Sequence, residues 1–185
     1  MTGKRLWQTI MLNLHRGSVS RGRYMKKVFA ECGDNVRFQI RVIPLYPELI
    51  RLGSNINIST GVRFVTHDAI HMVYNTLHAG EKNIPEMAQC IEIGNNVFIG
   101  VNCTILGNVK IGDNIIVSAN SLVNKDLPSG GIYGGVPAKK IGDFDSFWDK
   151  RVQLAYPTVR VNQHPTQEEI EEAWKCFEQS RRNNK

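Results

Sequence analysis

A hexapeptide repeat constrains this chain more than any other feature of its sequence. From residue 91 the chain reads IEIGNN VFIGVN CTILGN VKIGDN IIVSAN SLVNKD, six consecutive blocks of six residues. The first position of each block is mostly small or β-branched, the third is always a large aliphatic, and the last is always Asn or Asp. The third positions are Ile93, Ile99, Ile105, Ile111, Val117 and Val123, and the last are Asn96, Asn102, Asn108, Asn114, Asn120 and Asp126.

This period predicts a parallel β-helix. An α-helix has 3.6 residues per turn, so residues six apart would lie on opposite faces. In a short strand the first and third residues of a block point to the same side, here inward. The Asn or Asp then falls at a corner with positive φ, which these residues tolerate. Three blocks close an 18-residue triangular coil, and each coil buries its inner face only by stacking on its neighbours.

The same register occurs once before, over residues 50–67. Its inward positions are Ile50, Leu52, Ile56, Ile58, Val62 and Phe64, with Asn55, Gly61 and His67 in the corner positions. An irregular coil over residues 36–45 is expected before it. Between the two runs, residues 65–90 leave the period and carry three of the five histidines. Loops of this length are usually functional or disordered, so we expect this one to be functional.

Helical patterns occupy both ends of the chain. Leu6, Trp7, Ile10, Met11 and Leu14 have helical spacing, as do Tyr24, Val28 and Phe29. A C-terminal helix is predicted from the capping box Thr166–Glu169, with a buried stripe of Ile170, Ala173, Trp174 and Phe177. The predicted organisation is a basic helical arm (1–33), a β-helix domain (34–142) with an inserted loop (65–90), and a tail with a helix (143–185). The segment after Leu127 is expected to be a glycine-rich loop.

Composition narrows the class of protein. Apolar residues make up 42% and charged residues 22% of the 185 residues, which is typical of a globular domain. No apolar run approaches the roughly 20 residues of a membrane span, and no signal peptide is recognised at the N-terminus. The four cysteines have no zinc-like spacing. We therefore expect a cytoplasmic protein.

The net charge of +6 is concentrated at the N-terminus. Residues 1–30 hold seven Lys and Arg and no acidic residue. Such an arm could meet an anionic cofactor, an acidic glycan, a membrane surface or nucleic acid, or simply be a solvated helix face. No nucleic-acid-binding module is recognised, so no nucleic-acid partner is expected. A peripheral membrane contact through residues 4–29 stays open.

Three stretches in tandem resemble a known family. IGNNVFIGVNCTILGNVKIGDN, then SANSLVNKD, then GGVPAKKIG are similar to the hexapeptide-repeat acyltransferases, and within them to the maltose, galactoside and capsular-polysaccharide O-acetyltransferases. The resemblance implies a left-handed β-helix. The countable hexads give it about four coils, and the helical patterns at the two ends predict short terminal helices. The left hand comes from the resemblance alone, because parallel crossovers are generally right-handed. It also implies a homotrimer, acetyl-CoA bound between adjacent β-helices, no metal, and a histidine as general base.

Carried over to this sequence, the catalytic histidine is His67 of VTHD. Its corner position could also be explained by the backbone alone. His71 is a rival base because His67 comes slightly early compared with the maltose-type enzymes. Asp68 could orient an imidazole or be an ordinary loop residue.

The resemblance also assigns the cofactor contacts. The thioester and pantetheine contacts fall on Gly100, Val101 and Ala119, and the phosphate contacts on Asn124, Lys125 and Lys139. A lysine ammonium suits phosphate as a flexible point charge, although Lys139 and Lys140 could also be plain surface charge.

The predicted function is acetyl-CoA-dependent O-acetylation of a hydroxyl on a sugar or polysaccharide precursor. Serine or an amino sugar is the alternative acceptor within the fold. Two alternatives come from other classes. One is a γ-carbonic-anhydrase-like zinc enzyme, which would need three imidazoles such as His67, His71 and His78. The other is a β-helix scaffold without catalytic activity.

Overall fold

The computed structural model describes residues 3–153 and 164–182. The chain divides into two compact units, Met1–Asp145 and Ser146–Lys185. The first unit contains all the strands, and the second contains most of helix α4 (Phe144–Gln153) and helix α5 (Gln167–Arg182). Residues 154–163 of the predicted C-terminal tail lie outside the described part.

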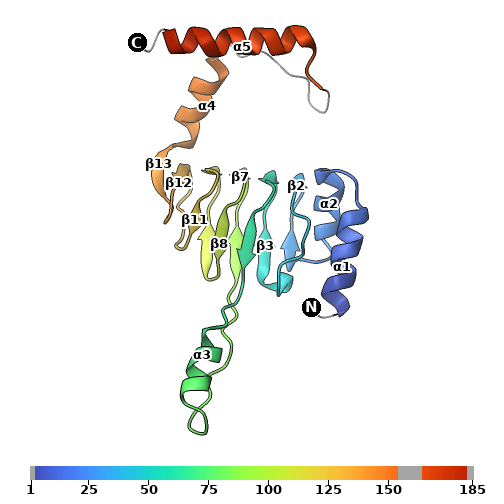
Figure 1. Ribbon diagram of the computed structural model, residues 1–185, viewed down its shortest axis with the longest axis vertical. Coiled ribbons are helices and arrows are strands. Elements are labelled where there is room, and N and C mark those ends of the chain that lie inside the picture. The colour runs from blue at the N-terminus through green and yellow to red at the C-terminus, as the bar shows by residue number, and fades with distance from the viewer. Residues whose placement is uncertain (1–2, 154–163, 183–185) are drawn as a thin grey trace. The chain divides into compact units, whose positions relative to one another are not determined.

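The first unit is a three-sided solenoid built from short strands (Figure 1). The first sheet contains β1 (Glu31–Cys32), β3 (Ile50–Leu52), β6 (Ile91–Ile93) and β9 (Val109–Ile111). The second contains β2 (Val36–Phe38), β4 (Ile56–Ile58), β7 (Val97–Ile99), β10 (Ile115–Val117), β12 (Gly131–Gly134) and β13 (Lys139–Asp143). The third contains β5 (Arg63–Val65), β8 (Thr104–Leu106) and β11 (Leu122–Val123). The pairing is parallel throughout, except between β12 and β13.

The strand register reproduces the sequence repeat. Ile91 pairs with Val109, one 18-residue coil further along the chain. Ile50 pairs with Ile91, so the coil before the long excursion stacks directly on the coil after it. The predicted three-block coil is therefore confirmed, and the excursion between β5 and β6 leaves the solenoid and returns without shifting its register.

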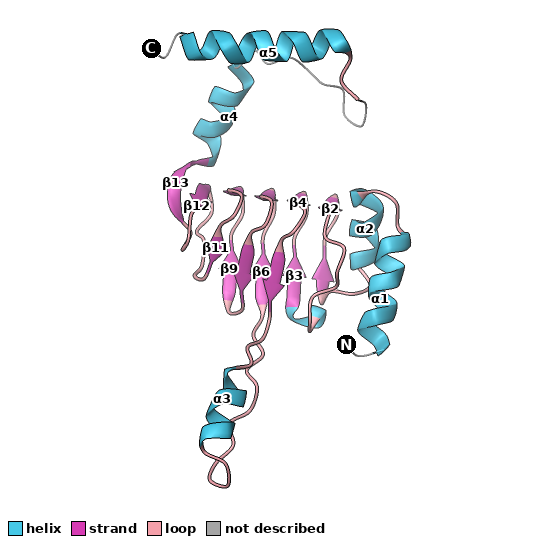
Figure 2. Cartoon of the chain, viewed as in Figure 1, coloured by secondary structure: helices cyan, strands magenta, loops and turns pink. Residues whose placement is uncertain are grey.

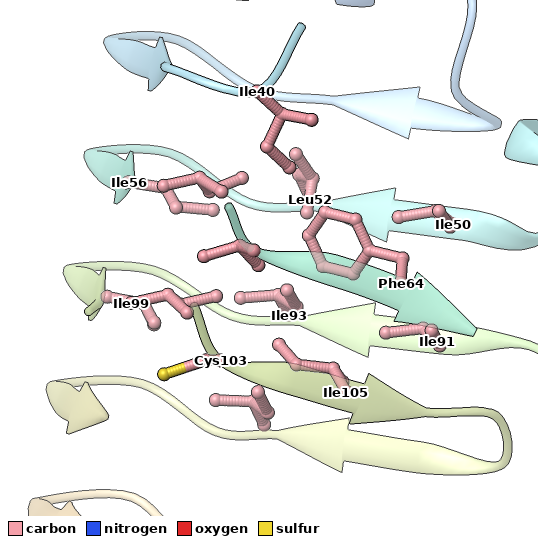
Figure 3. Packing of buried hydrophobic residues seen from close by; sticks show 14 of the residues in the cluster. Ile40, Ile50, Leu52, Ile56, Phe64, Ile91, Ile93, Ile99, Cys103 and Ile105 are labelled. Carbon is pink, nitrogen blue, oxygen red and sulfur yellow. The ribbon is translucent and has the colours of Figure 1, made fainter. Parts of the chain in front are cut away.

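The inward positions of the repeat form the core (Figure 3). At each level the aliphatic side chains stack on those of the coils above and below. Burying each of them contributes roughly 1.5–3 kcal/mol. All eighteen predicted inward residues are buried, which confirms the assignment: Ile50, Leu52, Ile56, Ile58, Val62, Phe64, Ile91, Ile93, Val97, Ile99, Cys103, Ile105, Val109, Ile111, Ile115, Val117, Ser121 and Val123.

The asparagines turn the corners as predicted. Asn55, Asn96, Asn102, Asn108, Asn114 and Asn120 all have φ between 55° and 60°. The expectation is wrong for Asp126 and His67, neither of which has a positive φ. Both end a run of regular hexads. After His67, which forms a bridge with Ala88, the chain leaves the coil, whereas after Asp126 the spacing changes, because Leu127 pairs with Ile111 of β9. A backbone requirement for positive φ therefore does not explain the histidine.

Helices α1 (Gly3–Leu14) and α2 (Ser18–Met25) cover the N-terminal end of the solenoid (Figure 2). Leu12 and Met25 are fully buried and join the core with Phe38. Arg21 is also buried, and its Nε donates a hydrogen bond to the Phe38 carbonyl at 2.8 Å.

The apolar stripe of α1 does not face this core. Leu6, Trp7, Ile10 and Leu14 are 51%, 60%, 52% and 69% exposed. The helix packs instead through its other side, where Gln8 is buried and Arg5 Nε donates to the Ile43 carbonyl at 2.9 Å. An apolar face thus stays open on this helix.

Three further segments contain elements that the sequence did not predict. The excursion contains helix α3 (Ile70–Leu77), and the expected glycine-rich loop contains the β12–β13 hairpin, which extends the second sheet. A 3₁₀ turn, η1 (Pro47–Leu49), precedes β3.

Helix α5 begins with the predicted capping box, in which Glu169 N donates to Thr166 Oγ1 at 3.2 Å and Thr166 N to Glu169 Oε2 at 2.8 Å.

The apolar stripe of α5 was expected to be buried, and this is wrong for the described structure. Its residues Ile170, Trp174 and Phe177 are 37%, 60% and 45% exposed. Within residues 3–153 and 164–182, no helix combines the length and apolar character needed to cross a membrane.

Candidate active site

His67 lies just beyond β5, where the third sheet gives way to the excursion. Phe64 and Thr66 point inward and are buried, whereas Arg63, Val65 and His67 alternate with them. The three side chains therefore share the outer side of the strand. The backbone bridge between His67 and Ala88 joins the outgoing and returning arms of the excursion and fixes the position of the imidazole.

An aromatic ring supports this imidazole from the side. The Tyr46 and His67 rings meet edge-on, with centroids 5.6 Å apart. The Tyr46 hydroxyl donates to Glu86, at 3.3 Å from Oε1 and 3.4 Å from Oε2, and the carboxylate charge raises the pKa of Tyr46. Nδ1 of His67 is buried and has no hydrogen-bond partner among the described residues.

The neighbouring candidates are engaged differently. The Asp68 carboxylate accepts a hydrogen bond from Ile70 N at 3.1 Å, so it holds the start of α3. His71 lies in the first turn of α3, and its Nδ1 is also buried without a partner in the described structure. His78 stacks on Tyr74. Among residues 3–153 and 164–182, no three His, Cys, Asp or Glu side chains gather as a metal site would require.

A pocket of about 480 Å³ lies beside His67. Ligand pockets commonly have 300–1,000 Å³, so this volume suits a small molecule. The wall is formed by residues 40, 42–45 and 62–65, and most of these are apolar. The polar groups that line it are Arg5, Arg63 and His67.

Gly100, Val101 and Ala119 come together at the corner between the second and third sheets. A Cβ built on Gly100 would lie 2.5 Å from Ala119 N, so only glycine allows the two coils to approach this closely. Asn120 N donates to the Val101 carbonyl at 2.8 Å and ties the same two levels together. The Ala119 N–H, by contrast, has no hydrogen-bond partner among the described residues.

Lys139 continues this corner at the next level. It pairs with Gly134 in the β12–β13 hairpin, and a Cβ on Gly134 would lie 3.3 Å from Ser118 Cβ, next to Ala119. Lys140 is engaged differently, because its Nζ forms a 2.7 Å ion pair with Asp143.

Asn124 and Lys125 lie at a different corner, the one that carries His67. Phe64 pairs with Ile105 and Ile105 with Val123, so the residues that follow β5 and β11 stack above one another. Within one chain the third sheet therefore separates His67, Asn124 and Lys125 from Gly100, Val101, Ala119 and Lys139.

Sequence reasoning missed four residues around His67: Arg5, Tyr46, Arg63 and Glu86. Arg63 could have been predicted from the sequence, because strand alternation places it on the same side as His67. The others come from irregular or helical segments, and only the tertiary structure brings them to this corner.

Comparisons with known proteins agree with this architecture. A family model described as bacterial transferase hexapeptide (six repeats) matches residues 91–125. Protein CapG of Staphylococcus aureus is 35% identical over 158 residues, which cover 83% of this chain and 88% of CapG. Galactoside O-acetyltransferase of Escherichia coli (strain K12) is 29% identical over 136 residues, 65% of this chain and 67% of that protein.

Solved structures have the same fold. A hexapeptide-repeat-containing acetyltransferase from Vibrio cholerae superposes with a TM-score of 0.58 at 22% identity, over 76% of this chain and 89% of that one. A galactoside acetyltransferase in complex with coenzyme A gives a TM-score of 0.52 at 23% identity, over 88% of each chain. Given its register of hexads and its similarity to CapG over most of both chains, this chain belongs to the hexapeptide-repeat acetyltransferase family.

Proposed function

We propose that this protein is an acetyl-CoA-dependent O-acetyltransferase of the cytoplasm that acts on a hydroxyl of a sugar or polysaccharide precursor, with His67 as general base. The observation that carries the proposal is the outward-facing imidazole beside a pocket large enough for a sugar. Two named proteins add support: galactoside O-acetyltransferase as a relative, and the V. cholerae acetyltransferase, whose structure was also solved with acetyl coenzyme A.

The reaction is a direct transfer. His67 removes the proton from the acceptor hydroxyl while that oxygen forms a bond to the thioester carbonyl carbon. The C–S bond then breaks, and the CoA thiolate takes up the proton from the imidazolium. A positioned base contributes about 10²–10⁴-fold. The unpartnered N–H of Ala119 is our candidate donor to the oxyanion, a contribution of similar size.

Acetyl-CoA lies along the Gly100–Ala119 corner in this proposal. The exposed Val101 and Ala119 leave the backbone accessible to the pantetheine arm. Asn124, Lys125 and Lys139 are exposed and serve the phosphates. Neither lysine forms an ion pair with another described residue, so both ammonium groups are available. The chemistry needs no metal.

A homotrimer would complete the site. The outer face of the first sheet is charged, and ion pairs join Lys110 to Glu92 at 2.7 Å and Arg51 to Glu31 at 3.2 Å. The outer face of the third sheet carries Val65, Leu106 and Leu122 beside Arg63 and Thr104, and is therefore more apolar than that of the first sheet. Such a face favours contact with other copies.

Three left-handed solenoids with their third sheets toward a common axis would place the His67 corner of one copy beside the Gly100–Ala119 corner of the next. Helix α3 adds to the contact surface, since Ile70, Val73 and Leu77 are 69%, 64% and 75% exposed. This arrangement brings together residues that a single chain keeps apart.

The proposal includes a peripheral membrane contact through residues 4–29. The exposed stripe of Leu6, Trp7, Ile10 and Leu14 supplies an apolar surface, and Arg16 follows it at the end of α1. An amphipathic helix with basic residues of this kind binds in the interface of anionic membranes. A lipid-linked glycan acceptor would be found there.

The test compares two histidine variants in an acceptor screen that detects released CoA thiol. We expect His67→Ala to lower kcat about 10²–10⁴-fold and His71→Ala to stay within about tenfold of wild type. The reverse result would move the base to His71. Serine and amino sugars in the same screen distinguish the alternative acceptors, and failure to bind acetyl-CoA would favour a scaffold.

A further inference from the structure

The pocket beside His67 has an unusual balance of charge. Eleven residues line it, and two of them are arginines, while none is Asp or Glu. Arg5 reaches it from α1, and Arg63 from β5, on the same side of the strand as His67. Two guanidinium groups thus flank one apolar wall.

Neither guanidinium is neutralised by the protein. Arg5 donates through Nε to the Ile43 carbonyl at 2.9 Å, which anchors the side chain without compensating its charge. The guanidinium of Arg63 has no hydrogen-bond or ion-pair partner among the described residues. By comparison, Lys4 is paired with Glu48 and Arg51 with Glu31.

Glu86 lies near His67 but does not neutralise either guanidinium. Glu86 accepts its hydrogen bonds from the Tyr46 hydroxyl and does not line the pocket. A cation next to apolar surface is stabilised by an opposite charge with hydrogen bonds. The guanidinium fork matches the geometry of carboxylate and phosphate oxygens.

We infer that the acceptor carries a negative charge, as a carboxylate or phosphate on the sugar, which Arg63 and Arg5 bind while its hydroxyl faces His67. This inference rests on the proposed function for the identity of the reaction. It adds the substrate class, since an uncharged sugar would leave both guanidinium groups without a counter-ion.

The experiment measures kcat/KM for matched acceptors on the full-length protein with acetyl-CoA. Methyl glucuronoside is compared with methyl glucoside, methyl galacturonoside with methyl galactoside, and glucose 6-phosphate with glucose. We expect the charged member of at least one pair to be preferred about 10- to 100-fold, as for a charge-assisted hydrogen bond. The pairs also distinguish a carboxylate from a phosphate.

Variants then assign the preference to Arg63. Arg63→Ala removes the preference by raising KM for the charged acceptor, and Arg63→Lys restores part of it, because the charge remains without the fork. Arg51→Ala is the matched control: this arginine lies on the outer face of the first sheet, away from the pocket. The Arg51→Ala variant is expected to keep the preference for the charged acceptor.

Two results overturn the inference while leaving the acetyltransferase intact. One is equal kcat/KM for charged and neutral acceptors. The other is an Arg63→Ala variant in which KM rises for acetyl-CoA instead of the acceptor, which would assign the guanidinium to the CoA phosphates. If no acceptor is acetylated, calorimetry with the three charged acceptors decides. Binding that Arg63→Ala weakens supports the inference although the proposed function fails, and unchanged or absent binding overturns it.

Discussion

The Tyr46 ring meets the His67 ring edge-on at an angle of 82°, from a backbone with φ of 51° that a bulky residue seldom adopts. The contact is therefore kept despite a conformational cost of about 1–2 kcal/mol. We conclude that Tyr46 positions the imidazole from the side, while its hydroxyl is held by Glu86.

Removing the Tyr46 ring is expected to slow transfer. Tyr46→Ala loses an aromatic contact of about 0.5–1.5 kcal/mol, so kcat should fall up to about tenfold. Tyr46→Phe keeps the ring and should stay within about threefold. Both variants keep a non-glycine residue at positive φ, so the comparison isolates the ring. Steady-state kinetics check this, and equal kcat values would remove the positioning role.

A ladder of asparagine side chains should stabilise one corner of the solenoid. Asn55 Nδ2 donates to Asn96 Oδ1, and Asn96 Nδ2 to Asn114 Oδ1, both at 2.8 Å. Asn96→Ala breaks both bonds and leaves a Cβ at positive φ, for a loss of about 2–4 kcal/mol. Asn96→Gly breaks the same bonds but tolerates the backbone, so it should cost about 1–2 kcal/mol less. Denaturant unfolding measures the difference; an equal loss would mean that φ has no part in it.

The cysteines should differ in reactivity and have no catalytic role. Cys103 is buried with its Sγ 3.0 Å from the Ser118 carbonyl, and burial raises the pKa of its thiol. A raised pKa leaves less thiolate at a given pH, so iodoacetamide at pH 8 should modify the exposed Cys90 first. Mass spectrometry of the labelled protein checks the order. Cys103→Ala should retain acetyl transfer, whereas abolished activity in a folded variant would make the thiol a candidate nucleophile.

The repeat made the solenoid predictable because its period acts locally. The aliphatic side chain at every sixth position points inward, and the asparagine three residues later turns the corner, so each block can be assigned from its own residues. Counting blocks within each coil could also have assigned the corners. His67 and Asn108 both end the third block of a coil, whereas Gly100 lies in a second block. The sequence contains no comparable signal for the proposed association of copies.

Other segments were missed for identifiable reasons. Strand β12 was not predicted, because its glycines indicated a loop. In the structure its Ile132 pairs with Ile116 in the second sheet. Ile70, Val73 and Leu77 have helical spacing that is consistent with α3, but the helix is only eight residues long and lies where the hexapeptide period is lost. The sequence predicted α1 but not its buried side, because that side is set by contacts to Arg41 and Ile43 that helical periodicity does not encode.

Membrane binding should depend on the exposed stripe of α1. Trp7→Ser combined with Ile10→Ser removes two large exposed apolar side chains without touching the buried Gln8 and Leu12. We expect flotation with phosphatidylserine-containing liposomes for the wild type, weakened at high salt, and little for the double variant. Trp174→Ser on α5 is the control for loss of any exposed tryptophan. Absence of wild-type flotation would remove the membrane contact.

The central claim is that His67 of one copy works beside the Gly100–Ala119 corner of another. Complementation tests it with two inactive chains, His67→Ala and Ala119→Glu, the second of which blocks an exposed corner position without entering the core. Each chain lacks one half of the site, and each supplies the half that the other lacks.

The decisive measurement is the acetyl-transfer rate of trimers assembled from equal amounts of the two chains. If the site forms between copies, random mixing restores about one quarter of the junctions, so about a quarter of wild-type activity should return. If the mixed sample is no more active than either variant alone, the two halves belong to the same chain and the account is wrong.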